Sequence, residues 1–209
     1  METSNLYNAI LTGNLAMAVE ITKQEIAHNT DPQFIINEYM MKAMEEVGAR
    51  FEAGKAFVPE LLMAARAMKG SLDLIKPLLG NQSNTTMGTI VIGTVKGDLH
   101  DIGKNLVASM LEGCGFTVIN LGVDISSDKF VNAVKENNAS IVCMSALLTT
   151  TMPYMQTVIE ALQEAGLRQN VKVMIGGAPV NKIFADKIGA DGYSDNANAA
   201  VTLARTLIA

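Results

Sequence analysis

The sequence predicts an α + α/β protein, in which an N-terminal four-helix bundle precedes a doubly wound parallel sheet of five strands. In residues 1–79, apolar side chains recur with the period of amphipathic helices. The second half instead alternates between short apolar runs and helical stretches, a pattern typical of a parallel sheet covered by helices on both faces. A small, polar, aperiodic stretch at Gly80–Gly88 predicts a linker between them. We therefore expect a helical domain over residues 1–87 and an α/β domain over residues 88–209.

The helical half is expected to hold four helices with short connections, which favour an antiparallel bundle. Gly13 and Asn14 separate the first two helices, and Asn29–Gln33 supplies capping side chains and a proline suited to a first turn. Gly54 ends the third helix and Pro59 opens the fourth. The expected helices cover Leu6–Leu11, Leu15–Ala27, Phe34–Phe51 and Pro59–Leu79.

The α/β half is expected to hold five strands, each followed by a helix. The strands are expected at Thr89–Val95, Thr117–Leu121, Ser140–Ser145, Val171–Ile175 and, more weakly, Asp191–Tyr193. The helices are expected at Gly103–Glu112, Ser127–Glu136, Tyr154–Glu164, Asn181–Ile188 and Asn196–Ile208. Five such units suggest the strand order 2-1-3-4-5, in which a ligand binds beyond the carboxyl ends of the strands, between the first and the third.

The composition favours a cytoplasmic globular protein. Of its 209 residues 49% are hydrophobic, and the net charge of -5 argues against nucleic acid as a partner. No apolar run reaches the roughly 20 residues that cross a bilayer, which argues against a membrane partner, and the N-terminus does not resemble a signal peptide. Cys114 and Cys143 lie in apolar runs and fit reduced, buried thiols better than a disulfide framework.

Three loops of distinct chemistry follow the first, third and fourth expected strands. The first, Lys96–Gly103, is rich in ionisable groups; the second, Ser145–Pro153, is rich in hydroxyls; the third, Gly176–Val180, begins with two glycines. Because the carboxyl ends of parallel strands share one edge of a sheet, we expect these loops to meet at the predicted ligand site.

The first loop places His100 between Asp98 and Asp101. A histidine in a loop or near a helix start commonly has only a structural role, and that interpretation stays open. A zinc site would need three or four ligands, but the chain holds one other histidine, His28, and two cysteines in other elements. His100 can serve a metal only if something else supplies most of the coordination sphere, as a macrocycle does. Asp98, two residues before it, is well placed to accept the second ring N–H.

The motifs of these loops resemble those of a known family. Asp98–Gly103 (DLHDIG) matches the DxHxxG signature of cobalamin-binding domains, Ser145–Leu147 matches their SxL motif, and Gly176-Gly177 matches their later diglycine. Residues 1–79, above all Phe51–Met68, resemble the helical cap that precedes this flavodoxin-like domain in methionine synthase and in small corrinoid proteins of methyltransferase systems.

The resemblance implies a base-off, His-on cobalamin site. His100 would be the lower cobalt ligand, Asp98 would orient it, and the Thr151 hydroxyl would complete a ligand relay. The remaining cofactor-binding residues implied are Gly97, Leu99, Asp101, Ile102 and Gly103 in the first loop, Ser145, Leu147, Thr149 and Thr150 in the second, and Gly176, Gly177, Tyr193 and Ala197 around the nucleotide tail. In the cap, Phe57 and Met63, with Val58, Ala64 and Ala67, are the candidates to cover the upper face.

The resemblance further implies a corrinoid methyl carrier without turnover of its own. It would accept a methyl group on Co(I) from a substrate-specific methyltransferase that uses a methylamine, methanol, betaine or a similar donor. It would pass the group from methyl-Co(III) to a second methyltransferase acting on tetrahydrofolate or a thiol cofactor, and a reductive activase is a further expected partner. The alternatives are a cobalamin-dependent regulator or photosensor, and the cobalamin subunit of a radical isomerase.

Overall fold

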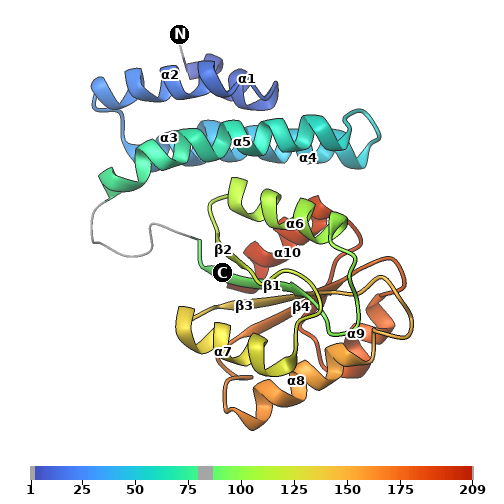
Figure 1. Cartoon of the computed structure of the whole chain (residues 1–209). Helices are drawn as coiled ribbons and strands as arrows, with labels where there is room; N and C mark the ends of the chain where they lie inside the picture. Colours follow the sequence, from blue (N-terminus) through green and yellow to red (C-terminus); the bar gives the residue numbers. More distant parts are fainter. Residues whose placement is uncertain (1–2, 80–86, 209) are drawn as a thin grey trace. The chain divides into compact units, whose positions relative to one another are not determined.

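The computed structural model describes residues 3–79 and 87–208 (Figure 1). The chain divides into two compact units, Met1–Thr85 with Glu112–Gly115 and Thr86–Leu111 with Phe116–Ala209. Most of the predicted linker, Gly80–Gly88, lies outside the described residues. Within the described residues, no helix has the length and apolar character needed to cross a membrane.

The N-terminal unit is helical, as predicted. Its elements are α1 (Thr3–Leu11), α2 (Leu15–Ala27), α3 (Pro32–Ile35), η1 (Ile36–Met41), α4 (Lys42–Glu52), α5 (Val58–Ile75) and the 3₁₀ turn η2 (Lys76–Leu79). The second helix has the expected bounds, whereas the first begins three residues earlier than predicted, at Thr3. The third expected helix is the continuous run α3–η1–α4. Leu6, Ile10, Ile35, Met40, Leu61, Met68 and Ile75 are fully buried large side chains of this unit.

The third helix differs from a regular α-helix at η1, which is a π-helix. The apolar pattern explains the difference, since Ile35 and Met40 are both buried and lie five positions apart. A wider π turn places residues at this spacing on one face. The predicted cap and first-turn proline are confirmed, because Asp31 accepts hydrogen bonds from the N–H groups of Gln33 and Phe34 and so caps a turn that opens with Pro32.

The break between α1 and α2 requires a glycine. Gly13 has a φ of +69°, and a Cβ added to it would lie 2.4 Å from Cβ of Met63 on α5. Asn14 then accepts a hydrogen bond from the Met17 N–H over 3.1 Å and caps α2. The predicted role of these two residues as a helix break is confirmed.

The second unit is the predicted doubly wound sheet. Its described strands are β1 (Thr89–Thr94), β2 (Thr117–Asn120), β3 (Ile141–Ser145), β4 (Lys172–Gly176) and β5 (Gly192–Tyr193), all parallel in the order β2-β1-β3-β4-β5. The helices are α6 (Ile102–Gly113), α7 (Ser127–Asn137), α8 (Tyr154–Glu164), α9 (Lys182–Ile188) and α10 (Ala197–Ile208). In Figure 1, α6 and α10 cover one face, and α7 and α8 cover the other. The predicted fold class and strand order are confirmed.

One core packs α7, α8 and α9 against the sheet. Phe130 of α7 and Met155 of α8 are fully buried there, against Val91 and Val142 of the central strands. Cys143 of β3 is also buried and free, and burial raises the pKa of its thiol to about 12. This thiol is therefore protonated and unreactive at neutral pH.

The strand register sets up the carboxyl edge of the sheet. Thr94 at the end of β1 pairs with Ser145 at the end of β3, which pairs with Gly176 at the end of β4. The three strands therefore end at the same level, and the three loops of interest start side by side.

Candidate functional site

The loops after β1, β3 and β4 meet at the carboxyl edge of the sheet. The Val95 N–H donates to the carbonyl of Ser145 over 3.0 Å, and the Ala146 N–H donates to the carbonyl of Gly176 over 3.3 Å. Gly177 has a φ of +126°, and a Cβ there would lie 1.9 Å from the Ala146 carbonyl oxygen. Only glycine allows this close approach of the β3 and β4 loops.

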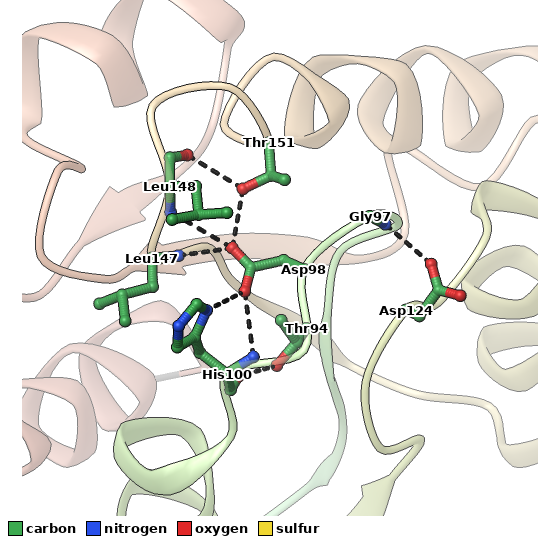
Figure 2. A network of polar contacts seen from close by, with 8 residues as sticks. All are labelled: Thr94, Gly97, Asp98, His100, Asp124, Leu147, Leu148 and Thr151. Carbon is green, nitrogen blue, oxygen red and sulfur yellow. Dashed lines mark hydrogen bonds and ion pairs between the residues drawn. The ribbon is translucent and has the colours of Figure 1, made fainter.

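Asp98 is the centre of a polar network that joins the first two loops (Figure 2). Its Oδ1 accepts a hydrogen bond from the backbone N–H of His100 over 3.1 Å and lies 2.8 Å from His100 Nδ1. Its Oδ2 accepts from the Thr151 hydroxyl over 2.7 Å and from the N–H groups of Leu147 and Leu148 over 2.8 and 3.3 Å. We call these five residues the Asp98 network.

The network holds Asp98 ionised although the side chain is fully buried. Burial by itself raises the pKa of the Asp98 carboxyl, but the hydrogen bonds from Thr151, Leu147 and His100 outweigh it and keep the pKa well below its usual range. An ionised carboxylate is only an acceptor. The hydrogen bond therefore places a proton on Nδ1 of His100 and leaves the lone pair of the neutral imidazole on Nε2.

The His100 side chain is 52% exposed, in contrast to the Asp98 carboxylate that holds it. Within the described residues, Nε2 has no hydrogen-bond partner. Apolar side chains of both loops are also exposed around the network: Leu99, Ile102, Leu147 and Leu148. An oriented imidazole nitrogen is thus presented among apolar groups.

These residues fit a metal that is carried by a macrocycle and do not fit a free ion. The described residues contain no group of three or more histidine, cysteine, aspartate or glutamate side chains that could hold a metal. One imidazole with an oriented lone pair supplies a single axial ligand, and exposed apolar side chains suit the faces and edges of a large ring. A Cβ added to Gly103 meets nothing within 4 Å, so space is open at the start of α6 as well.

Asp101 belongs to a different cluster, although it stands next to His100. Its Oδ2 accepts a hydrogen bond from the Asn105 side chain over 2.9 Å. The buried Lys104 donates from Nζ to Oδ1 of Asn105 and of Asn120, over 2.6 and 2.8 Å. Burial lowers the pKa of the Lys104 ammonium, and Asp101 opposes this effect. This cluster ties the first turn of α6 to the end of β2.

The remaining predicted site residues lie on several elements near the carboxyl edge of the sheet. Ser145 and Gly176 end neighbouring strands, whereas Thr149 and Thr150 are exposed in the turn before Thr151. The β5 end lies beside β4, since the Ser194 N–H donates to the Ile175 carbonyl over 3.2 Å; this brings Tyr193, which ends β5, to the same edge. Ala197 is buried at the start of α10.

The cap candidates divide by exposure within the helical unit. Phe57, which precedes α5, is 68% exposed, and Val58 and Met63 are also exposed. Ala64 and Ala67 on α5 are fully buried. The apolar spacing alone did not separate these two groups, because both lie in one short stretch from Phe57, just before α5, to the third turn of that helix.

Asp124 was not identified from the sequence. It lies in the loop between β2 and α7, and its Oδ1 accepts a hydrogen bond from the Gly97 N–H over 2.8 Å (Figure 2). Its place just beyond the second strand, at the same sheet edge, is the signal that could have pointed to it.

Comparisons with known proteins agree with this geometry. Two families, each described as a B12 binding domain, match residues 88–202 and residues 4–76. Dimethylamine corrinoid protein 1 of Methanosarcina acetivorans is 49% identical over 193 residues, which cover 92% of this chain and 89% of that protein. A cobalamin-binding protein from Desulfitobacterium hafniense has a similar structure, with a TM-score of 0.83, 33% identity and coverage of 99% of this chain and 98% of that chain. The methanol:cobalamin methyltransferase complex MtaBC of Methanosarcina barkeri gives a TM-score of 0.82 at 30% identity, covering 99% of this chain and 79% of that chain.

Proposed function

Because the chain belongs to the family of corrinoid proteins with B12-binding domains, we propose that it carries methyl groups in a methylamine methyltransferase system. The observation that supports this most directly is the Asp98 network, which fixes an exposed imidazole with its Nε2 lone pair available. Identity with a dimethylamine corrinoid protein is 49%, against 30% with the methanol system. These values favour a methylamine as the methyl donor.

His100 would hold the corrinoid as its lower axial ligand. When bound, the corrinoid supplies a cobalt atom that takes up and releases the methyl group. Asp98 would fix the tautomer and the ring orientation of His100 through Nδ1. Leu99, Ile102 and Leu147 would contact the ring system, because they are the exposed apolar groups nearest to His100 in sequence and network.

The β4 loop would receive the nucleotide tail of the corrinoid. Gly176 and Gly177 present backbone without side chains beside Ala146 and Ser194. A Cβ at either position would crowd these neighbours, so both glycines are needed to keep the β4 loop in the place where the tail would bind. Ser145, Thr149, Thr150, Tyr193 and Ala197 are the further residues proposed to line this pocket, and Asp101 and Gly103 complete the His100 loop.

The same imidazole nitrogen can hold a proton or a metal. With Asp98 ionised, a proton taken up at Nε2 gives an imidazolium paired with a buried carboxylate. Proton uptake and ligation would therefore compete at one atom, and the Thr151 hydroxyl would take part by holding Oδ2 of Asp98. This couples ligation to the protonation state of the Asp98 network.

The partners would be methyltransferases. A similar chain is part of a methanol:cobalamin methyltransferase complex. By analogy, this chain would dock with one methyltransferase that acts on the donor and with a second that acts on tetrahydrofolate or a thiol cofactor. A reductive activase would restore oxidised cofactor. Phe57 and Met63, which are exposed in the helical unit, would be residues of a cap over the methyl-bearing face.

Absorption spectroscopy tests the proposal. The purified protein and the variant His100→Ala are incubated with hydroxocobalamin, freed of unbound cofactor by gel filtration, and compared. Stoichiometric corrinoid in both, with a spectrum that changes in the variant, is the expected result. In His100→Ala, the rate of methyl cycling with both partner enzymes should fall more than the amount of corrinoid that the protein retains. If neither folded protein retains corrinoid, the proposal fails.

A further inference from the structure

The loop that presents His100 is held by contacts that lie outside the Asp98 network. After β1 the chain turns through Gly97, whose φ is +83°. The Gly97 N–H donates to Oδ1 of Asp124 over 2.8 Å, as Figure 2 shows. The Asp124 N–H in turn donates to the carbonyl of Asp98 over 3.1 Å. One residue of the β2–α7 loop therefore bonds to Asp98 and to the residue before it.

Asp124 takes up a backbone conformation that few residues adopt. Its φ is +55°, in the left-handed region, where aspartate, asparagine and glycine are the usual residues. Its side chain is exposed, so hydrophobic burial does not explain this conformation. The hydrogen bonds of Asp124 to the His100 loop do explain it.

The two chain segments are paired before this contact, and the residues after it are held by the end of β1. Val95 and Ile125 form a parallel β-bridge, and the Ile125 N–H donates to the Thr94 carbonyl over 3.0 Å. Beyond the contact, the Thr94 hydroxyl donates to the His100 carbonyl over 2.8 Å. The backbone is thus fixed before, at and after Asp98.

We propose that Asp124 is a positioning residue for the His100 ligand. By accepting a hydrogen bond from the Gly97 N–H and donating one to the Asp98 carbonyl, it directs the Asp98 carboxylate toward Nδ1 of His100 and so sets where Nε2 points. The assignment rests on the proposed function, in which His100 is the lower ligand. Asp124 acts through the backbone of the loop and does not itself contact His100 through its side chain.

Asp124→Gly separates the side-chain contact from the backbone conformation. Glycine removes the carboxylate, accepts a positive φ without strain and keeps the N–H that bonds to Asp98. Asn138→Gly is the matched control, since Asn138 is also exposed, has a φ of +47° and lies at the end of α7, away from the loop. Asp124→Asn keeps an oxygen acceptor and the tolerance for positive φ, and should therefore preserve the contact.

The primary readouts use the protein without corrinoid. In Asp124→Gly, amide hydrogen exchange at Gly97 should become about tenfold faster, the effect of losing one hydrogen bond to a carboxylate. The ¹⁵N signals of the His100 ring should also shift as its bond to Asp98 loosens. Asn138→Gly and Asp124→Asn should leave both readouts unchanged. Unchanged Gly97 exchange and unchanged His100 signals in Asp124→Gly would overturn the assignment.

Two further measurements complete the test. After loading with hydroxocobalamin, the absorption spectrum of Asp124→Gly should move toward that of His100→Ala, whereas a wild-type spectrum overturns the role in ligation. If Asp124→Gly does not fold, a scalar coupling between ¹⁵N of Gly97 and ¹³Cγ of Asp124 in the wild-type protein tests whether their hydrogen bond forms. Absence of this coupling overturns the contact. Failure of the wild-type protein to retain corrinoid would instead defeat the proposed function and leave the results on the corrinoid-free protein intact.

Discussion

Replacing Asp98 by asparagine tests whether a buried carboxylate organises the site. Asparagine has nearly the same shape, but one acceptor oxygen becomes an NH₂ donor. Two donors of His100 face Oδ1, and three donors face Oδ2: the N–H groups of Leu147 and Leu148 and the Thr151 hydroxyl. Whichever way the amide turns, its NH₂ therefore opposes at least two donors.

The number of opposed donors sets the expected loss of stability. A hydrogen bond to a charged group contributes about 1.5–3 kcal/mol, and a buried donor without a partner costs about 1–3 kcal/mol. The His100 ring is half-exposed and can turn toward water, so its share of the loss is the smaller one. We expect the unfolding free energy of the α/β unit to fall by about 3 kcal/mol.

Amide hydrogen exchange of the β1 residues measures this loss in the α/β unit alone. Asp101→Asn is the matched control, because Asp101 stands in the same loop but is exposed and accepts one side-chain bond, from Asn105. We expect the control to lose less than about 0.5 kcal/mol. A loss below about 1 kcal/mol in Asp98→Asn, or equal losses in the two variants, would refute the reasoning.

Three further predictions address pH, the hydroxyl and the close backbone approach. Hydrogen bonds hold the pKa of Asp98 below its unfolded value of about 3.9. The contribution of Asp98 to stability is therefore present above that pH and is lost as the pH falls. In urea titrations, the difference in unfolding free energy between the wild-type protein and Asp98→Asn should shrink below about pH 4. Thr151→Val should lower the unfolding free energy by about 1.5–3 kcal/mol, whereas Thr151→Ser, which keeps the hydroxyl, should lower it much less. An equal loss of unfolding free energy in both variants would point to packing instead. Gly177→Ala should lower the unfolding free energy by at least about 2 kcal/mol more than Gly122→Ala does. Both glycines have a positive φ, but only a Cβ at Gly177 would meet backbone atoms, which are those of Ala146. Equal melting temperatures of the two variants would contradict this prediction.

The elements of the fold could be predicted because local signals agree with tertiary structure over most of the chain. The predicted strands and helices of the α/β unit end within two residues of the observed ones. The π turn of η1 was missed, since an apolar period averaged over a long helix does not resolve a spacing of five between Ile35 and Met40. The exposure of Phe57 and the burial of Ala64 also depend on packing that periodicity does not resolve.

The site could be predicted where its contacts are short in sequence. Asp98 and His100 are two residues apart, so their bond followed from the loop itself. Thr151 lies 53 residues from Asp98 and was suggested only by the family resemblance. Asp124 contacts Gly97 across 27 residues, and this contact depends on how the β1 and β2 ends align, which a single sequence does not state.

Most of the hydrogen bonds to Asp98 hold its carboxylate in place, and only one of them orients the imidazole of His100. Four of the five donors are backbone N–H groups or the Thr151 hydroxyl, and only one is the His100 ring. Loss of the ring bond would leave the buried carboxylate with four partners, so it does not expose Asp98 to the full cost of an unpaired buried charge. The half-exposed ring is thus the replaceable member of the network, which would suit the proposed role of His100 as a ligand that binds and releases a metal.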